Sequence, residues 1–302
     1  MNSVSQGLAF GAMQFGTTAD EHAAAAMVEA CLAAGLSDFD TAHGYGDGAS
    51  EQILGRLLRG VAGVRIATKA GYIGGAGRAN LRAQLAESMD RLGLPVDLWY
   101  LHRFDPETPL EETVETLVEA KAEGLVRRIG VSNFAAWQVM KAQGIAVAMG
   151  GRIDAIQPMY SVVKRQVEVE LLPMAMDQRL AVYSYSPLGG GFLTGKYATG
   201  GQGRLTTDAR YARRYSGVPE GVDAGFARLA AEAGLHPVTL AVAWVMAHPA
   251  RPVPIVSARD AAQLAPALAA ARLRLEPALK AAVAALVPAP PPATDRSEEG
   301  SG

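Results

Sequence analysis

The feature that most constrains this chain is a regular alternation of short apolar runs with longer Ala- and Leu-rich runs. Eight apolar runs have strand character, and segments with helical periodicity separate them. The predicted strands are residues 7–10, 36–40, 64–69, 96–101, 126–131, 153–157, 180–184 and 253–256. Strands that alternate with helices form a parallel sheet, because each crossover helix returns the chain to the same edge.

Eight such units are the number that closes into a barrel, so the predicted fold class is α/β, a (β/α)8 TIM barrel. The chain has 302 residues, of which 49% are hydrophobic and 19% charged, enough to bury one core of that size. Nothing in the middle of the chain indicates a second domain. We therefore expect a single domain over residues 1–287. Residues 288–302 are rich in Pro, Ser and Glu and are predicted to be a disordered tail.

Start and stop signals delimit the predicted helices. Asp20 is expected to cap a helix that ends before Gly35, Ser50 to cap a helix over residues 50–59, and Pro109 to open one that ends before Gly124. The other predicted helices are residues 80–92, a segment from 135, 167–178, 260–270 and 277–286. The long connection over residues 197–220 is rich in Gly, Thr and Arg, which is typical of a lid or a binding loop.

Charge and composition exclude several classes of partner. The net charge of −2 provides no field that would attract nucleic acid or a membrane surface. The longest apolar run, residues 238–247, is too short to span a bilayer, and the first residues lack the features of a signal peptide. The single Cys31 forms no internal disulfide, and no His or Cys pair has the spacing of metal ligands. These observations predict a cytoplasmic protein without a metal.

Polar residues follow consecutive predicted strands, at the rim where a parallel barrel carries its chemistry. Asp40 ends the second strand, Lys69 the third, and His102 follows the fourth. Tyr45 lies in the glycine-rich loop after Asp40. Asp40 and Tyr45 alone fit either an active-site corner or an ordinary turn. Four such side chains from three consecutive units, all on one rim, favour an active site.

With its flanking residues, this set resembles the aldo-keto reductase superfamily. The segments that carry the resemblance are Phe39-Asp40-Thr41-Ala42 with Tyr45-Gly46, Ala67-Thr68-Lys69, Tyr100-Leu101-His102, residues 129–134 and residues 185–191. They occur in the family's order and cover most of the chain. Residues 133–137 and 160–173 are similar to the branch that contains the aflatoxin-aldehyde reductases and the potassium-channel β subunits.

The resemblance implies reduction of an aldehyde or ketone, a small-molecule carbonyl, to an alcohol by hydride transfer from NADPH. The residue types suit this reaction. Tyr45 would donate the proton, and the charge of Lys69 would lower the pKa of that phenol. Asp40 would compensate the buried Lys69 charge, and a neutral His102 would orient the carbonyl.

The resemblance also implies a cofactor site. The residues at matching positions are Asp40, Ser132, Asn133, Gln157, Tyr185, Ser186, Leu188, Lys196, Ser257, Arg259 and Gln263. Tyr185 matches the ring that stacks on the nicotinamide, and Arg259 suits a 2′-phosphate, which favours NADPH. NADH stays possible, because Ala267 replaces the family's usual Asn and Asp260 adds a negative charge.

Rim aromatic residues are the candidate substrate pocket. Phe15, Tyr72 and Phe104, together with Trp137, predict an apolar or aromatic aldehyde or ketone. Arg103 either meets an anionic group or faces solvent. The arginines of the 197–220 connection either fold over the pyrophosphate or are solvated.

Two other functions stay open. The chain fits a redox-sensing module that holds NADP, turns over slowly and has a protein partner. It also fits a barrel enzyme such as an aldolase that uses Lys69 as a Schiff base. The oligomeric state is not predicted.

Overall fold

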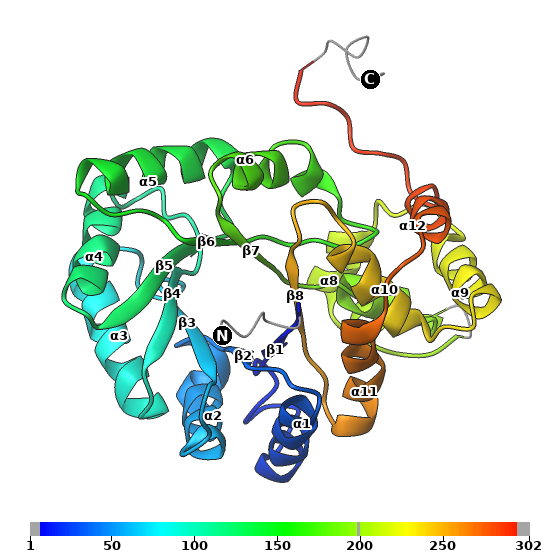
Figure 1. Ribbon diagram of the computed structural model, residues 1–302, viewed down its shortest axis with the longest axis horizontal. Coiled ribbons are helices and arrows are strands. Elements are labelled where there is room, and N and C mark those ends of the chain that lie inside the picture. The colour runs from blue at the N-terminus through cyan, green and yellow to red at the C-terminus, as the bar shows by residue number, and fades with distance from the viewer. Residues whose placement is uncertain (1–6, 198–199, 295–302) are drawn as a thin grey trace.

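The computed structural model describes residues 7–197 and 200–294, apart from the side chain of Arg204. Eight parallel strands close into a barrel in the order β1 to β8, which confirms the predicted (β/α)8 fold (Figure 1). The strands are β1 (Ala9–Gly11), β2 (Asp38–Asp40), β3 (Arg65–Ala70), β4 (Val96–Leu101), β5 (Val126–Ser132), β6 (Ala155–Gln157), β7 (Ala181–Ser184) and β8 (Val253–Val256). Each lies where the sequence predicts a strand, and the ends agree to within two residues.

A ring of helices surrounds the barrel (Figure 1). They are α1 (Glu21–Ala33), α2 (Ala49–Leu58), α3 (Arg78–Leu92), α4 (Leu110–Ala122), α5 (Ala136–Ala148), α6 (Leu171–Asp177), α7 (Arg204–Thr207), α8 (Ala209–Tyr215), α9 (Val222–Glu232), α10 (Pro237–Met246), α11 (Ala261–Ala269) and α12 (Pro277–Ala284). Short 3-10 turns are η1 (Tyr45–Gly48), η2 (Gln166–Glu168), η3 (Gly189–Thr194) and η5 (Ala270–Arg272). Residues 288–294 form neither helix nor strand, and the rest of the predicted tail lies outside the described residues.

Ser50 does not cap a helix, contrary to the sequence-based expectation. It lies inside α2 and is fully buried, and Gly48 precedes the helix. The Ser50 hydroxyl donates to the carbonyl of Ala12 at 2.8 Å and shares a hydrogen bond of 2.8 Å with the hydroxyl of Thr41. The side chain therefore connects the ends of β1 and β2 instead of satisfying the helix terminus.

Several helices also differ from their predicted extents. The helix expected over residues 167–178 begins only at Leu171, after η2. The expected loop over residues 197–220 contains α7 and α8, and the sequence does not predict α9 or α10. Nearly every residue of α10 is apolar and buried, so it lacks the alternation with polar residues that reveals most helices.

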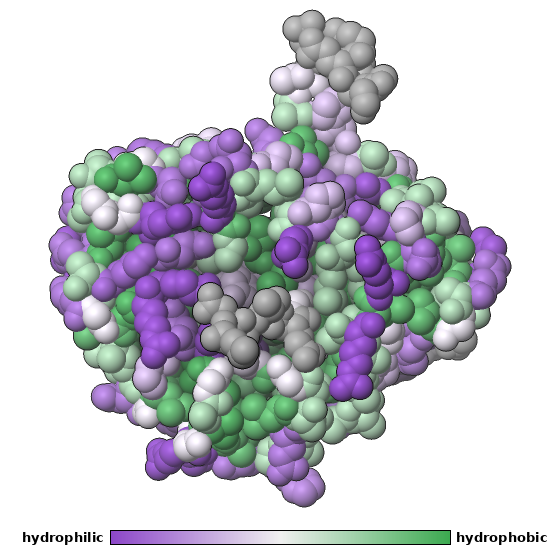
Figure 2. All heavy atoms as spheres, in the orientation of Figure 1, coloured by the Kyte–Doolittle hydropathy of each residue, from purple (hydrophilic) through white to green (hydrophobic). Residues whose placement is uncertain are grey.

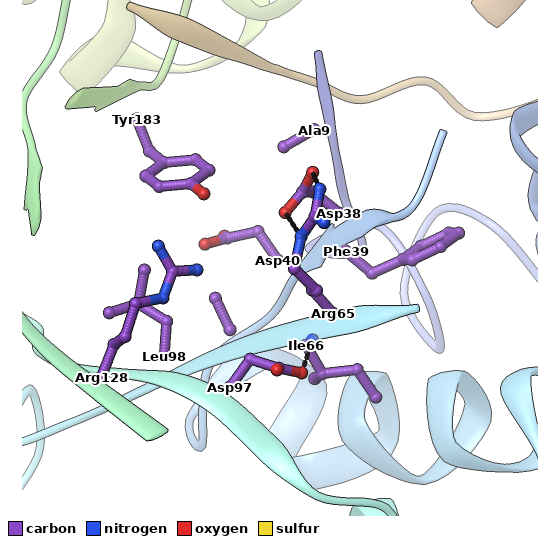
Figure 3. Close-up of a pocket in the computed structure, with 11 residues that line it drawn as sticks. Ala9, Asp38, Phe39, Asp40, Arg65, Ile66, Asp97, Leu98, Arg128 and Tyr183 are labelled. Carbon is purple, nitrogen blue, oxygen red and sulfur yellow. Dashed lines mark hydrogen bonds and ion pairs between the residues drawn. The ribbon is translucent and has the colours of Figure 1, made fainter. Parts of the chain in front are cut away.

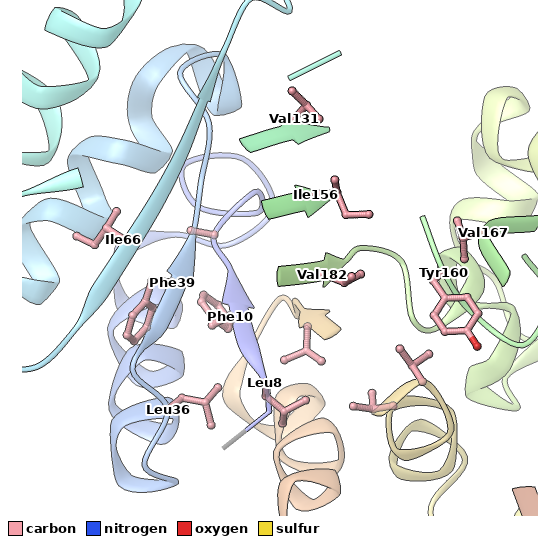
Figure 4. Packing of buried hydrophobic residues seen from close by; sticks show 14 of the residues in the cluster. Leu8, Phe10, Leu36, Phe39, Ile66, Val131, Ile156, Tyr160, Val167 and Val182 are labelled. Carbon is pink, nitrogen blue, oxygen red and sulfur yellow. The ribbon is translucent and has the colours of Figure 1, made fainter. Parts of the chain in front are cut away.

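Apolar side chains form two layers. The larger cluster lies between strands and helices and includes Phe10, Phe39, Ile66 and Val131 (Figure 4). A small cluster of Leu98, Tyr100 and Ala155 lies inside the barrel. The two layers follow from the alternation of side chains along each strand.

The barrel interior also carries charge. Asp38 and Asp40 of β2 point inward, and Arg65 of β3 donates to both carboxylate oxygens of Asp38 at 2.8 and 2.5 Å (Figure 3). Arg128 and Tyr183 approach the same space from β5 and β7. The cavity between these side chains is about 10 Å³, room for at most one water molecule. The barrel interior is therefore too small for a substrate.

Ion pairs join the outer helices. On the ridge between α3 and α4, Arg82 pairs with Glu119 and Glu123, and hydrophilic side chains gather on this side of the molecule (Figure 2). Within the described ranges, no single helix is long and apolar enough to cross a membrane. Helices α9 and α10 reach that length and hydropathy only as a pair, with a bend of 93° between them.

Candidate active site

The four predicted catalytic residues lie together at the carboxyl ends of β2, β3 and β4. The Lys69 ammonium donates to Asp40 Oδ1 at 2.5 Å and to the carbonyl oxygen of Thr41 at 2.6 Å. Lys69 is only 1% exposed and Asp40 only 6%. A buried ammonium is tolerated only when it is paired, so this ion pair is a fixed part of the site.

Tyr45 lies in η1, half-buried above this ion pair. The Lys69 ammonium is 5.2 Å from the centroid of the Tyr45 ring. The His102 ring meets the Tyr45 ring edge to face, with centroids 5.7 Å apart. The phenol, the ammonium and the imidazole therefore face one small region of the rim.

Burial and neighbouring charges together determine the protonation of Tyr45 and Lys69. Burial raises the pKa of Tyr45 above its ordinary value, although the charge of Lys69 acts in the opposite direction. The expected effect of Lys69 on the Tyr45 pKa is thus present but does not dominate. Burial also acts to lower the pKa of Lys69, but Asp40 and Tyr45 outweigh it and raise that pKa. At neutral pH both groups carry their protons.

His102 is neutral at physiological pH. Burial lowers the pKa of His102 to about 3, and the charges of Lys69 and Arg103 act in the same direction. A neutral imidazole can donate one hydrogen bond without repelling Lys69. This state is the one that the predicted role of His102 requires.

Polar side chains at the ends of β5, β6 and β7 connect to this group. Gln157 Nε2 donates to Asp40 Oδ2 at 2.8 Å, and Ser132 Oγ donates to the carbonyl of Gln157 at 2.9 Å. Asn133 Nδ2 donates to the carbonyl of His102 at 2.9 Å, and the Tyr185 hydroxyl donates to Asn133 Oδ1 at 2.6 Å. The structure therefore brings four predicted cofactor residues into one network with Asp40 and His102.

Backbone strain marks the same edge of the barrel. Asn133 and Ser186 both have φ of +58°, in the left-handed region that residues with a side chain seldom adopt. Asp47, two residues after Tyr45, has φ of +51°. Such conformations concentrate at functional sites, because surrounding contacts must hold them in place.

The remaining predicted cofactor residues lie on other segments. Leu188 is half-buried at the start of η3, and the Lys196 ammonium is 4.9 Å from the centroid of the Tyr197 ring. Ser257 and Arg259 are exposed between β8 and α11. Gln263 Oε1 accepts a hydrogen bond of 2.9 Å from the Arg259 backbone N–H.

The structure places the two residues that depart from the expected cofactor pattern, Asp260 and Ala267. Asp260 is the N-cap of α11, where Oδ1 accepts from the backbone N–H of Gln263 at 2.8 Å. Ala267 is buried on the inner face of α11. Together with the exposed Arg259, the amides near Asp40 and the Tyr185 ring fit a nicotinamide dinucleotide in chemical type.

Phe15 does not line the substrate site, contrary to the expectation from sequence. Its ring is 0% exposed and packs against Phe10, with centroids 5.5 Å apart, so it belongs to the core. Tyr72 is on the rim, 54% exposed, with its ring centroid 4.9 Å from that of His102. The Arg103 guanidinium lies 4.7 Å from the centroid of the Tyr72 ring.

Phe104 and Trp137 lie further along the rim, with ring centroids 6.1 Å apart. Beside them, a groove of about 460 Å³ has the size of a small-molecule site. It is lined by Asn133, Phe134, Met159, Tyr185, Val287 and other residues. Asn133 and Tyr185 connect this groove to the polar network.

Helix α8 brings two arginines of the predicted binding loop, Arg210 and Arg214, close to the site, together with Tyr211, which the sequence does not single out. Burial raises the pKa of Tyr185 to about 12, and the charge of Arg214 acts to lower it. Tyr211 acts to raise the pKa of both Tyr185 and Tyr45. Asp208 raises the pKa of Arg210, and Tyr72 on the rim adds to that effect, which shows that Arg210 and Tyr72 are close. The predicted binding loop therefore reaches the candidate catalytic group through a short helix. In the sequence, only the arginine content of this loop indicates that it reaches the site.

Among the described residues, no group of three His, Cys, Asp or Glu side chains is arranged to hold a metal ion.

Comparison with known proteins agrees with this geometry. Residues 7–287 match the family described as "Aldo/keto reductase family". Aflatoxin B1 aldehyde reductase member 2 of Rattus norvegicus is 42% identical over 199 residues, which cover 63% of this chain and 54% of that protein. The probable voltage-gated potassium channel subunit beta of Oryza sativa subsp. japonica is 33% identical over 269 residues, 80% of each chain.

A third relative covers nearly the whole chain. The oxidoreductase YrpG of Bacillus subtilis, whose name describes it as uncharacterized, is 31% identical over 307 residues, 94% of this chain and 92% of that protein. By contrast, the matched segment spans about half the length of the aflatoxin-aldehyde reductases. The resemblance inferred from the sequence motifs, including its branch, is confirmed.

Proposed function

Since the chain belongs to the aldo/keto reductase family, we propose that it reduces an aldehyde or ketone to an alcohol with NADPH and that Tyr45 is the proton donor. The observation that carries the proposal is the buried Lys69–Asp40 ion pair directly beside the Tyr45 phenol. An ion pair with only a structural role would not require the exchangeable phenolic proton of Tyr45 beside its ammonium at the open end of the barrel.

The side chains divide the chemistry among them. Bound NADPH would supply a hydride to the carbonyl carbon, which leaves negative charge on the carbonyl oxygen. Tyr45 donates its proton to that oxygen, so the phenolic O–H bond breaks as the alcohol O–H bond forms. The Lys69 ammonium stabilises the resulting phenolate, and solvent returns the proton to Tyr45. Neutral His102 donates a hydrogen bond that orients the carbonyl.

The polar network and α11 would hold the cofactor. Ser132, Asn133 and Gln157 carry the hydroxyl and amides that suit a carboxamide, and the half-buried Tyr185 ring suits stacking. The exposed Arg259 guanidinium suits a 2′-phosphate, which supports NADPH over NADH.

Replacement of Tyr45 by Phe tests the proposal. Tyr45→Phe keeps the ring but removes the proton, so we expect carbonyl reduction to fall by at least ~100-fold, the range of one lost general acid. NADPH affinity, measured by fluorescence titration, should stay within a few-fold. Tyr72→Phe is the matched control on the same rim, because it removes a phenolic O–H but keeps the aromatic ring that lines the proposed substrate site, so its kcat should stay close to that of the wild type. A Tyr45→Phe variant that keeps most of its turnover would exclude Tyr45 as the donor.

The similarity to a potassium channel β subunit supports a second candidate, a module that holds NADP, turns over slowly and regulates a partner. Steady-state turnover on a panel of aldehydes separates the two, because a regulatory module would bind NADPH and show little turnover on any of them. The aldolase alternative is less favourable, because the raised pKa of Lys69 keeps the amine protonated and non-nucleophilic.

The substrate is proposed only by class. Tyr72, Phe104 and the groove beside Asn133 give the rim an apolar and aromatic character. This surface favours an apolar or aromatic carbonyl compound.

A further inference from the structure

The loop that carries Tyr45 is attached to helix α3 by charged side chains behind the active site. We call Arg91, Glu87, Glu51 and His43 the Arg91 cluster. Arg91 Nη1 donates to the main-chain oxygen of His43 at 3.1 Å and to Glu51 Oε2 at 3.3 Å. Arg91 Nη2 donates to Glu87 Oε2 at 3.1 Å, and the same oxygen shares a hydrogen bond of 2.7 Å with His43 Nε2. The main chain and the ring of His43 are therefore both held from α3.

The Arg91 guanidinium also lies against the far end of this loop. A Cβ placed on Gly48 would be 2.6 Å from Arg91 Cζ, and Gly48 has φ of +92°. Only glycine fits this approach without strain. Arg91 thus contacts the chain two residues before Tyr45 and three residues after it.

Glu51 extends the cluster to the strand that carries Lys69. Glu51 is completely buried, and Oε1 accepts a hydrogen bond of 2.6 Å from the Thr68 hydroxyl. Thr68 immediately precedes Lys69 on β3. Through Arg91 and Glu51, the loop of the proton donor and the strand of the ammonium are connected to the same helix.

We infer that Arg91 is a positioning residue that holds Tyr45 in place relative to Lys69. This inference rests on the proposed function of Tyr45. The hydrogen bonds of 3.0 Å from His43 N–H to the Lys69 carbonyl and 3.1 Å from Tyr45 N–H to the Ala42 carbonyl hold only the start of the loop. A general acid must be held to within a fraction of an ångström. Loss of the Arg91 contacts slows proton donation and leaves substrate and cofactor binding unchanged.

Arg91→Lys is the informative variant, because it keeps a positive charge beside the buried Glu51. One ammonium cannot span the His43 carbonyl, Glu51 and Glu87 together, because it lacks the fork of a guanidinium. The matched control is Arg82→Lys, an arginine of the same helix that pairs with Glu119 and Glu123. KM for the aldehyde and Kd for NADPH are determined for each variant, and two further measurements are made on the intact chain. One is hydrogen exchange of the backbone over residues 42–50, and the other is single-turnover reduction of 4-nitrobenzaldehyde by NADPH in stopped flow.

We expect Arg91→Lys to raise exchange over residues 42–50 and to slow the single turnover about tenfold, equivalent to ~1.4 kcal/mol. KM for the aldehyde and Kd for NADPH should stay within about threefold, a split that a general loss of structure would not produce. Arg82→Lys should change neither measurement. Unchanged exchange in Arg91→Lys would overturn the inference, as would raised exchange with an unchanged single turnover.

A second variant tests whether the slower turnover results only from a less stable fold. Glu87→Gln removes the negative charge that both Arg91 and His43 contact, which weakens these hydrogen bonds, and it strands no buried charge. We expect a smaller slowing of the single turnover, about two- to threefold, with an unchanged thermal midpoint; equal rates for Glu87→Gln and wild type would contradict the role of the cluster. If the wild type reduces no carbonyl at all, the proposed function fails. Hydrogen exchange still decides whether Arg91 holds the loop.

Discussion

At the scale of single residues, the site depends on protonation states that burial and neighbouring charges together determine. Tyr45 keeps its proton, Lys69 keeps its charge, and His102 stays neutral. The sequence predicts the identity of all three, because they follow strand ends. It does not predict the direction of each pKa shift, because burial and the distances between charges exist only in the folded chain.

The depressed pKa of His102 makes stability depend on pH. The unfolded imidazole binds a proton near its ordinary pKa of ~6.5, whereas the folded one does so only near pH 3. Between these values the unfolded state binds more protons, so stability is lost as pH falls. At about pH 4.5, His102 alone should lower the free energy of unfolding by ~3 kcal/mol relative to pH 7.

Urea denaturation of the wild type and His102→Gln at the two pH values measures this contribution. The variant should lose less stability on acidification. His22→Gln, at an exposed position on α1, is the control and should behave as the wild type. The same acid dependence in all three proteins would show that His102 is not held neutral.

Arg259 is the residue on which cofactor preference is expected to depend. Arg259→Ala removes an exposed guanidinium at the start of α11, so we expect NADPH affinity to fall about tenfold or more. NADH lacks the 2′-phosphate, and its affinity should be nearly unchanged. Fluorescence titration with both nucleotides measures the two effects, and an equal loss for both would exclude Arg259 from that role.

At the scale of elements, contacts between neighbouring helices are closer at some glycines than at others. Gly55 of α2 faces the end of α3, and a Cβ there would lie 2.2 Å from the Leu92 carbonyl oxygen. Gly144 of α5 is exposed, and a Cβ on it would meet no neighbouring side chain or other element within 4 Å. The sequence alone does not distinguish these two helical glycines.

The same substitution should therefore have opposite effects at the two positions. Gly55→Ala forces α2 away from α3 and should destabilise the protein by ~1–3 kcal/mol. Gly144→Ala should stabilise it by ~0.5–1 kcal/mol, because alanine reduces the entropy of the unfolded chain. Chemical denaturation of both variants checks the signs. Destabilisation by Gly144→Ala would contradict the open surroundings of this position on α5.

The elements that the sequence predicts well are those whose cause is local. Strands appear as apolar runs, and Asp20 caps α1 as its position predicts. Ser50 is misassigned because its hydroxyl bonds to the residue after β1, 38 positions away in the chain. Helix α10 escapes prediction because it is buried on all sides and has no polar face.

At the scale of the whole molecule, the barrel explains why the candidate catalytic residues could be predicted to lie together. Closing eight parallel strands brings all their carboxyl ends to one rim, so residues that follow different strands meet. What the topology does not determine is which side chains bond across the rim. Gln157 donates to Asp40 from 117 residues away, and Arg91 reaches the Tyr45 loop from α3. Neither contact has a sequence signal of its own.

The ion pair between Asp38 and Arg65 has a consequence for protein engineering. β2 has only three residues, so apolar alternation barely specifies its register against β3. A slip by one residue would place Phe39 inside the barrel and leave Asp38 and Asp40 among the helices without partners. Loss of the Asp38–Arg65 ion pair would destabilise the slipped register. The pair therefore fixes the position of Asp40 along the barrel axis. In a chimera or an evolved library, residues 38–40 and Arg65 should therefore be inherited together as one block.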